Sequence, residues 1–181
     1  MNKRAAIVGG GVIGGGWAAR FILMGWDVVV YDPAPDAERK LGEVLDNARR
    51  SLPGLSDVSL PVEGRLSFAA SLDEAIRHAT WVQESVPECL DLKHNILRQI
   101  QAACQPEAII GSSTSGFKPS ELQQDSKNPN QIIVAHPFNP VYLLPLVELV
   151  GETGSVTKAS QILADIGMKP LRVRKEIDAH I

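Results

Sequence analysis

This sequence of 181 residues has few cysteines and no excess of lysine and arginine over aspartate and glutamate. Its two cysteines, Cys89 and Cys104, are too few for a disulfide framework or a zinc site, and we expect no metal. The formal net charge of -3 leaves no basic surface of the kind that binds nucleic acid. These absences exclude a disulfide-rich secreted domain, a zinc module and a nucleic-acid-binding protein.

Long hydrophobic runs are missing as well. No stretch of about 18 apolar residues is present to span a membrane. Residues 1–4 lead directly into an apolar run typical of a strand, where a secreted protein would have a longer cleavable segment. We therefore expect a cytoplasmic protein with no membrane contact. With 44% hydrophobic and 22% charged residues, the chain has the composition of one globular domain with a substantial core.

Glycine is concentrated in the segment Gly9-x-Gly11-x-x-Gly14, which separates a predicted strand from a predicted helix. Gly9 allows the tight turn, Gly11 lets the backbone approach a pyrophosphate, and Gly14 lets helix and strand pack closely. The free N–H groups at the start of the helix would then face the phosphates. The expected cofactor contacts are Gly9, Gly10, Gly11, Val12, Ile13 and Gly14.

A second predicted strand ends in an acid, Asp32, about 20 residues after the glycines. A carboxylate at this point accepts hydrogen bonds from the adenine ribose hydroxyls and repels the 2′-phosphate of NADP. Residues 33–36 contain no arginine to receive such a phosphate. The sequence therefore favours NAD over NADP, although Asp32 could instead serve only to begin the turn at Asp32-Pro33.

Predicted strands and helices alternate along the chain without a repeat or an obvious linker. This alternation is typical of an α/β domain with a doubly wound, mostly parallel sheet, a Rossmann-type fold. Residues 51–57 have the composition of a loop, and Ser71 and Ser120 have the spacing of capping boxes. Polar residues follow the predicted strand ends, so we expect them to line one shared cleft. These groups are residues 9–14, 32, 84–88, 112–115 and 136–139.

His136 follows one apolar strand, and Glu148 interrupts another. A carboxylate among apolar residues needs a partner, and this imidazole is the nearest candidate. If the chain folds back between them, Glu148 would fix the tautomer of the ring and leave its other nitrogen to accept a proton. The alternative is a core histidine and an edge-strand carboxylate that faces water. The other histidines lack such a setting: His78 and His94 are expected on solvated helix faces, and His180 lies at the chain end.

Several motifs in order resemble the NAD-binding domain of the 3-hydroxyacyl-CoA dehydrogenase family, over essentially the whole chain. They are the glycine segment, Glu88-x-x-x-x-Lys93, the Ser-Ser-Thr-Ser run at 112–115, and His136-x-x-Asn139-Pro140 with Glu148. The resemblance implies that His136 is the general base for a 3-hydroxyl whose hydride passes to NAD, and that Glu148 orients it. It also implies that Ser115 and Asn139 hydrogen-bond the reacting oxygen or the nicotinamide end. Glu88 and Lys93 would lie along the cofactor, with a solvated acid and lysine at a helix start as the alternative.

Within that family, residues 17–20, 84–88, 113–120 and 136–148 are most similar to members that oxidise the 3-hydroxyl of L-carnitine to 3-dehydrocarnitine. The resemblance implies that residues 1–181 are the NAD-binding domain of a homodimeric dehydrogenase whose helical C-terminal domain lies outside this chain. Aromatic faces usually hold a quaternary ammonium. Phe117, Phe138 and Tyr142 are candidates, with core packing as the alternative.

Two other functions remain open at this point. The first keeps the chemistry but takes a 3-hydroxyacyl-CoA or a related 3-hydroxy acid as its substrate. The second is a dinucleotide-binding module without catalysis. Such a module has no need for a contact between His136 and Glu148, so the distance between these two residues separates it from an enzyme.

Overall fold

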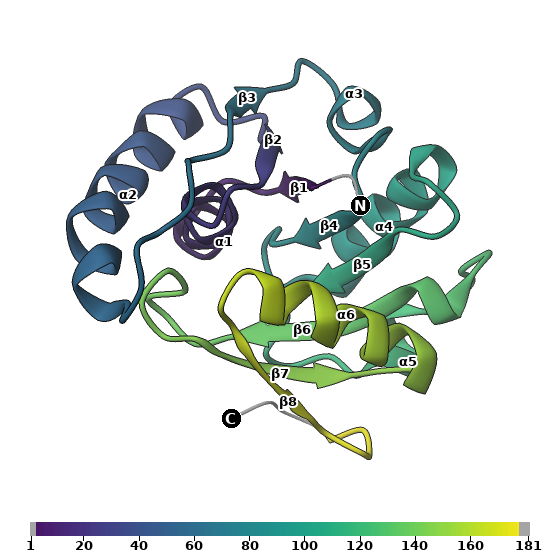
Figure 1. Ribbon diagram of the computed structural model, residues 1–181. Coiled ribbons are helices and arrows are strands. Elements are labelled where there is room, and N and C mark those ends of the chain that lie inside the picture. Colours follow the sequence, from purple (N-terminus) through teal and green to yellow (C-terminus); the bar gives the residue numbers. More distant parts are fainter. Residues whose placement is uncertain (1–2, 178–181) are drawn as a thin grey trace.

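The computed structural model describes residues 3–177, and within this range eight strands form one sheet in the order β3-β2-β1-β4-β5-β6-β7-β8 (Figure 1). The strands are β1 (Arg4–Val8), β2 (Asp27–Tyr31), β3 (Leu66–Phe68), β4 (Trp81–Glu84), β5 (Ile109–Ser112), β6 (Ile132–Pro137), β7 (Leu146–Val150) and β8 (Lys169–Arg172). The α-helices are α1 (Val12–Leu23), α2 (Ala37–Ser51), α3 (Leu72–Ile76), α4 (Leu90–Ala103), α5 (Pro119–Leu122) and α6 (Thr153–Asp165). Two short 3-10 helices are η1 (Leu52–Leu55) and η2 (Pro129–Gln131).

The direction of the strands brings distant segments to one edge of the sheet. Pairing is parallel from β3 through β6, so the segments that follow these strands all emerge at the carboxyl edge. β7 runs antiparallel to β6, which places its first residues at the same edge. β8 pairs parallel with β7. The doubly wound, mostly parallel sheet expected from the sequence is confirmed.

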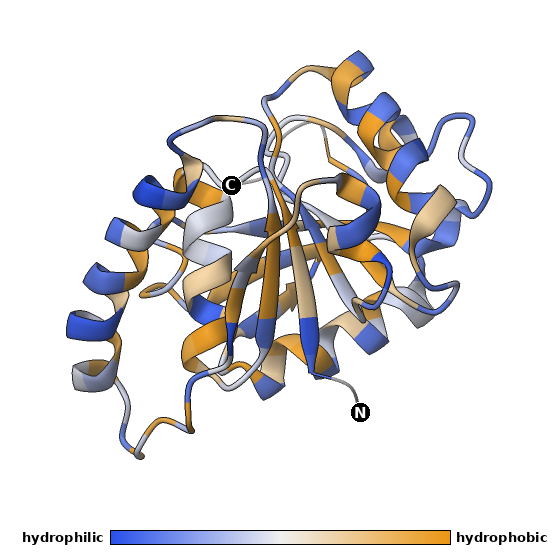
Figure 2. Cartoon of the chain, turned by 90° about the horizontal axis from the view of Figure 1, so that it is seen from above, coloured by the Kyte–Doolittle hydropathy of each residue, from blue (hydrophilic) through white to orange (hydrophobic). Residues whose placement is uncertain are grey.

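Helices cover both faces of the sheet and bury two hydrophobic cores. Helices α1, α2 and α6 pack on one face, and α3, α4 and α5 pack on the other (Figure 1). Apolar strands run through the middle of the molecule, and the helices turn their hydrophilic residues outward (Figure 2). Phe21 of α1 lies between two tryptophans, with ring centroids 5.2 Å from Trp26 and 6.1 Å from Trp81. These aromatic contacts fix α1 against the sheet.

The glycine turn before α1 is packed too closely for side chains. Gly9 has a φ of +93°, and a Cβ there would lie 2.7 Å from the carbonyl oxygen of Ser85. A Cβ on Gly14 would lie 1.8 Å from the carbonyl oxygen of Gly9. The close packing predicted for Gly14 is therefore present, and the turn also touches the segment that follows β4.

The cap predicted at Ser120 was wrong. Helix α5 begins at Pro119, a residue suited to the first helical position because no N–H partner is needed there. The Glu121 carboxylate accepts a hydrogen bond from the backbone N–H of Lys118 at 2.7 Å, and the Ser120 hydroxyl donates to Glu176 instead. The prediction at Ser71 is confirmed in one half: the Ser71 hydroxyl accepts from the N–H of Glu74 at 3.2 Å, but the Glu74 carboxylate accepts from the N–H of Ala70 and not from that of Ser71.

Two further expectations need correction. The segment at 51–57, expected to be a loop, contains η1. His94 is half-buried, and its Nε2 lies 2.6 Å from the carbonyl oxygen of Glu121, so it does not occupy a solvated helix face. His78 is exposed as expected, and His180 lies outside the described residues.

Across residues 3–177, the structure contains no helix long and apolar enough to cross a membrane.

Candidate active site

The start of α1 presents free backbone at the carboxyl edge of the sheet. Gly11 is the N-cap residue, and no side chain caps the helix. A Cβ on Gly11 would meet nothing within 4 Å, and the adjacent Val12 is 67% exposed. The backbone at the start of the helix is therefore open to a ligand, as the binding of a pyrophosphate requires. Residues 9–14 fit the diphosphate of a dinucleotide such as NAD.

Asp32 lies directly after β2, and its carboxylate is held against the glycine turn. One oxygen accepts a hydrogen bond from the N–H of Gly10 at 2.6 Å, and the other accepts from Ala34 at 2.8 Å. The carboxylate thus steadies the following turn as well as the glycine turn. Its half-buried position at the strand end is where an adenine ribose is bound in this type of fold.

His136 and Glu148 form a buried pair between β6 and β7. The two residues are register partners, and the imidazole Nδ1 lies 2.8 Å from the carboxylate Oε2. The side chain of Glu148 is 2% exposed and that of His136 is 13% exposed. Because an ionised carboxylate can only accept a hydrogen bond, Nδ1 is the donor in this contact. The alternative of a water-facing Glu148 is wrong.

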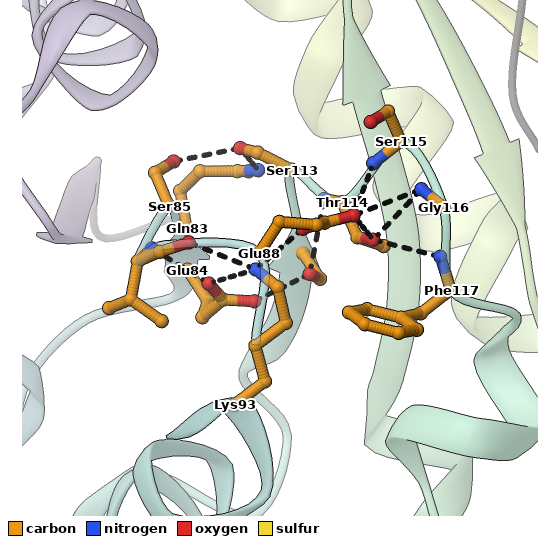
Figure 3. Close-up of polar contacts among 12 residues, drawn as sticks. Gln83, Glu84, Ser85, Glu88, Lys93, Ser113, Thr114, Ser115, Gly116 and Phe117 are labelled. Atoms are coloured by element: carbon orange, nitrogen blue, oxygen red, sulfur yellow. Dashed lines mark hydrogen bonds and ion pairs between the residues drawn. The ribbon is translucent and has the colours of Figure 1, made fainter. Parts of the chain in front are cut away.

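Glu88 organises the segment that follows β5 (Figure 3). Its carboxylate oxygen Oε1 accepts hydrogen bonds from the Thr114 hydroxyl and from the backbone N–H groups of Ser115 at 3.1 Å and Gly116 at 3.0 Å. The Thr114 hydroxyl oxygen accepts in turn from the N–H of Phe117 at 3.0 Å. Glu88 and Thr114 therefore determine where the backbone of Ser115 lies.

The pKa of Glu88 is set by opposing influences. Burial raises the pKa of this carboxyl, but hydrogen bonds from Thr114 and Gly116 and the charge of Lys93 lower it by more. The net result is a pKa below the ordinary value of a glutamate. Glu88 is consequently a firmly ionised acceptor at neutral pH.

Lys93 is buried, with a side-chain exposure of 1%. Its ammonium contacts Glu84 at 2.8 Å, the carbonyl oxygen of Val86 at 3.1 Å and Glu88 at 3.4 Å (Figure 3). Glu84 also accepts from the Ser112 hydroxyl at 2.5 Å. The alternative of a solvated lysine is therefore wrong. Three acceptors surround the ammonium, and through them α4 is tied to the ends of β4 and β5.

A second group of polar side chains consists of Gln83, which was not predicted from the sequence, and Ser85 and Ser113, which were named only as members of the polar segments 84–88 and 112–115. The Gln83 amide donates to the Ser113 hydroxyl at 2.8 Å, and the hydroxyls of Ser85 and Ser113 lie 2.7 Å apart. The same Gln83 nitrogen lies 3.4 Å from the carbonyl oxygen of Ala135, the residue before His136. Gln83 thus connects the serine segment to β6.

The remaining predicted residues lie in the loops of the same edge. Ser115 and Asn139 are exposed, and Phe117, Phe138 and Tyr142 are half-buried. Phe138 stands beside the imidazole of His136, with ring centroids 5.7 Å apart. Tyr142 packs on the core beneath α1, α2 and α6, whereas Phe117 packs on the opposite core. Core packing therefore accounts for part of the surface of Phe117 and Tyr142.

Comparison with known proteins gives a consistent picture. Residues 4–177 match the family described as 3-hydroxyacyl-CoA dehydrogenase, NAD binding domain. A Ruegeria pomeroyi protein named L-carnitine dehydrogenase/betainyl-CoA thioesterase is 66% identical, over 98% of this chain and 37% of that protein. A Mesorhizobium japonicum protein named L-carnitine dehydrogenase is 52% identical, over 100% of this chain and 51% of that protein. The chain thus spans about a third to a half of these two relatives.

Solved structures share the fold. The NAD⁺-dependent 5-formyl-3-hydroxy-2-methylpyridine 4-carboxylic acid 5-dehydrogenase superposes with a TM-score of 0.90 at 29% identity, over 100% of this chain and 60% of that chain. The (S)-3-hydroxybutyryl-CoA dehydrogenase of Ralstonia eutropha superposes with a TM-score of 0.86 at 24% identity, over 100% of this chain and 66% of that chain. The second likeness concerns the fold alone.

Proposed function

The chain belongs to the 3-hydroxyacyl-CoA dehydrogenase family, in which it is an NAD-binding domain, and from this premise we propose that the protein oxidises the 3-hydroxyl of L-carnitine to 3-dehydrocarnitine. The observation that carries the proposal is the buried contact of 2.8 Å between His136 and Glu148 at the edge where the glycine turn lies. Relatives named L-carnitine dehydrogenase, one of them 52% identical over the whole chain, support the choice of substrate.

Because the chain spans less than two thirds of these relatives, the proposal concerns the complete protein. We propose that residues 1–181 act there as the cofactor domain, together with a helical C-terminal domain, in a cytoplasmic homodimer. The family resemblance of the motifs supports this arrangement. Size measurement of the complete protein in solution tests the dimer.

NAD, when bound, supplies the site that accepts the hydride. The chain's own contribution is to hold the diphosphate at residues 9–14 and the adenine ribose at Asp32. Backbone N–H groups at a helix start favour negative charge through both hydrogen bonding and the helix dipole. The open space in front of Gly11 supports this placement.

His136 is proposed to remove the proton of the 3-hydroxyl through Nε2. Glu148 would hold the ring by Nδ1 and stabilise the positive charge that develops when the ring accepts the proton. General bases of this kind contribute about 100-fold to 10,000-fold in rate. The burial of Glu148 supports the assignment, because charge stabilisation is stronger where water is excluded.

Ser115 and Asn139 are proposed to hydrogen-bond the reacting oxygen or the nicotinamide end. Both are exposed at the carboxyl edge, where a ligand can reach them. Glu88 is proposed to lie along the cofactor. Lys93 would serve the same site indirectly, since its three acceptors already surround the ammonium.

The trimethylammonium of carnitine cannot donate a hydrogen bond, so an aromatic face is its natural contact. Phe138 packs beside the proposed base, with ring centroids 5.7 Å apart, which supports it as the first candidate. Phe138→Leu in the complete protein should raise the KM for L-carnitine and leave the affinity for NAD unchanged. Tyr142→Leu and Phe117→Leu complete the set, and an unchanged KM in all three variants would refute the aromatic contact.

The proposed activity is tested by NADH formation when L-carnitine is the only oxidisable compound present. A parallel assay with a 3-hydroxyacyl-CoA separates the two dehydrogenase alternatives, because the proposal expects turnover with L-carnitine and little with the thioester. Turnover with the thioester alone would move the substrate assignment to it. NAD binding without turnover of either substrate by the complete protein would favour a non-catalytic module.

A further inference from the structure

The loop between β6 and β7 lies across the middle of helix α1. Val141 of this loop is fully buried and packs against Gly16. A Cβ built on Gly16 would lie 2.9 Å from the Cβ of Val141 and 3.1 Å from its Cγ2. Because Gly16 has no side chain, Val141 of the loop packs directly against the backbone of α1 at this point.

Arg20 lies one helical turn after Gly16 and holds the backbone around the same loop. Its guanidinium donates to the carbonyl oxygens of Ile166 at 2.8 Å, Gly167 at 2.6 Å and Tyr142 at 3.3 Å. Arg20 is only 6% exposed, and burial lowers the pKa of its guanidinium. Its donors thus connect α1, the loop and the end of α6.

The two ends of this arrangement carry the groups that meet in the proposed reaction. The glycine turn lies at the start of α1. The loop that packs on α1 follows His136 and contains Asn139. A buried arginine that bonds carbonyls in two other segments fixes their relative positions, because any shift leaves its N–H groups unsatisfied. Helix α1 is thus in contact with both sides of the proposed site.

We propose that Gly16 and Arg20 are positioning residues that seat the loop of residues 138–145 on α1. These contacts between α1 and the loop, which we call the loop seat, fix the spacing between two parts of the proposed site. One is the cofactor turn at the start of the helix, and the other is the proposed substrate-binding side chains of residues 136–142. This inference rests on the proposed function for its kinetic consequence. The alternative is that Arg20 only closes the carboxyl end of α6 through Ile166 and Gly167.

Two neighbouring glycines of α1 provide a matched test. Gly16→Ala drives a methyl group into Val141, whereas Gly15→Ala places one at 3.5 Å from Val44, an ordinary contact. Both substitutions bring the same gain in helix propensity. In the complete protein, Gly16→Ala should lower kcat/KM for L-carnitine by about 10-fold to 100-fold, since a displacement of about 1 Å can cost that much. The Kd for NAD should change by less than about twofold, and Gly15→Ala should alter neither value.

Arg20→Met should reproduce the pattern of Gly16→Ala, and Arg20→Lys should recover part of the loss because one donor group remains. Hydrogen exchange of the amides in residues 139–145 gives a readout that does not depend on activity. Exchange should rise in Gly16→Ala and Arg20→Met and stay at the wild-type rate in Gly15→Ala.

The proposal would be overturned if Gly15→Ala and Gly16→Ala changed kcat/KM equally. It would also be overturned if the amides of residues 139–145 exchanged at the wild-type rate in Arg20→Met. A loss of NAD affinity with an unchanged KM for L-carnitine would also overturn it. If the wild-type protein does not oxidise L-carnitine, the proposed function fails, and the exchange comparison alone decides whether the loop seat exists.

Discussion

The imidazole of His136 donates from Nδ1 to the carboxylate of Glu148, at 2.8 Å, across the antiparallel pair of β6 and β7. The antiparallel register of β6 and β7 places Glu148 directly opposite His136. A parallel β7 would present its last residues at the carboxyl edge, whereas the antiparallel strand presents its first residues there. The strand that departs from the parallel pattern therefore supplies the partner of the proposed base.

Replacement of Glu148 by glutamine tests how the ring is held. The amide of glutamine is nearly isosteric with the carboxylate, but it carries no charge to stabilise the protonated ring. We expect kcat of the complete protein to fall about 100-fold or more, with the Kd for NAD unchanged. Glu43→Gln, which alters an exposed carboxylate of α2, is the control. A kcat within twofold of wild type would show that the ring does not depend on this carboxylate.

The glycine turn can be tested without altering any ligand-facing side chain. Gly14→Ala places a Cβ 1.8 Å from the carbonyl oxygen of Gly9, so the turn has to move. Overpacking of this kind costs about 1 to 3 kcal/mol, and we expect the affinity for NAD to fall at least about tenfold. Titration calorimetry measures the affinity. Gly42→Ala is the matched control, because a Cβ there meets nothing within 4 Å; equal affinities of the two variants would contradict the account.

Lys93 and Glu84 form a buried ion pair whose contribution to the free energy of unfolding depends on both partners. Lys93→Met leaves the Glu84 carboxylate buried without its cation, which should lower the free energy of unfolding by about 3 to 5 kcal/mol. The double variant with Glu84→Gln should recover part of this loss, because it removes the stranded charge. Urea unfolding of both variants gives the comparison. The exposed pair of Lys40 and Asp36 is the control, and Lys40→Met should lower the free energy of unfolding far less than Lys93→Met does.

Glu88 should make stability depend on pH in the acid range. Its pKa is lower in the folded protein than in the unfolded chain, so its contribution is fully present above the ordinary glutamate pKa of about 4.3. The contribution is lost as the pH falls through the lowered value. Wild type should therefore exceed Glu88→Gln in stability near neutral pH, and the difference should shrink in acid. A difference that stays constant between about pH 7 and pH 3 would contradict the lowered pKa.

Much of the fold could be predicted from local sequence patterns. Strand β1 ends at Val8 and helix α1 begins at Val12, on either side of the glycine segment as predicted, and the sheet is mostly parallel as the alternation of strands and helices indicated. The cap at Ser120 was mispredicted because two start signals compete within a few residues, and Pro119 with Glu121 prevails. Local spacing alone does not rank such signals, since the outcome depends on a distant contact between Ser120 and Glu176.

The site was predictable in its main parts but not in its supporting network. His136 and Glu148 were paired correctly because a carboxylate in an apolar strand needs a partner. The burial of Lys93 was missed, although Lys93, Leu97 and Ile100 form one buried stripe on α4. A lysine on an apolar stripe is the signal that could have revealed it. Its partner Glu84 ends β4, the strand that directly precedes α4, and stands nine residues before Lys93 in the chain.

Cavity size would not have located the proposed site. A cavity of about 500 Å³ is lined by Gly151, Thr153 and Arg172 among others, near the end of β7. Because β7 is antiparallel, its end lies at the edge opposite the glycine turn. The chemistry of the side chains and the direction of the strands located the proposed site better than this cavity did.

Replacement of His136 by glutamine, assayed for NADH formation from L-carnitine and for NAD affinity in the complete protein, tests the central claim most directly. We predict that kcat falls by about 100-fold to 10,000-fold while the Kd for NAD stays within about twofold of wild type. Turnover near the wild-type rate, or a loss of NAD binding that accounts for the lost activity, would contradict the assignment of His136 as the proton acceptor.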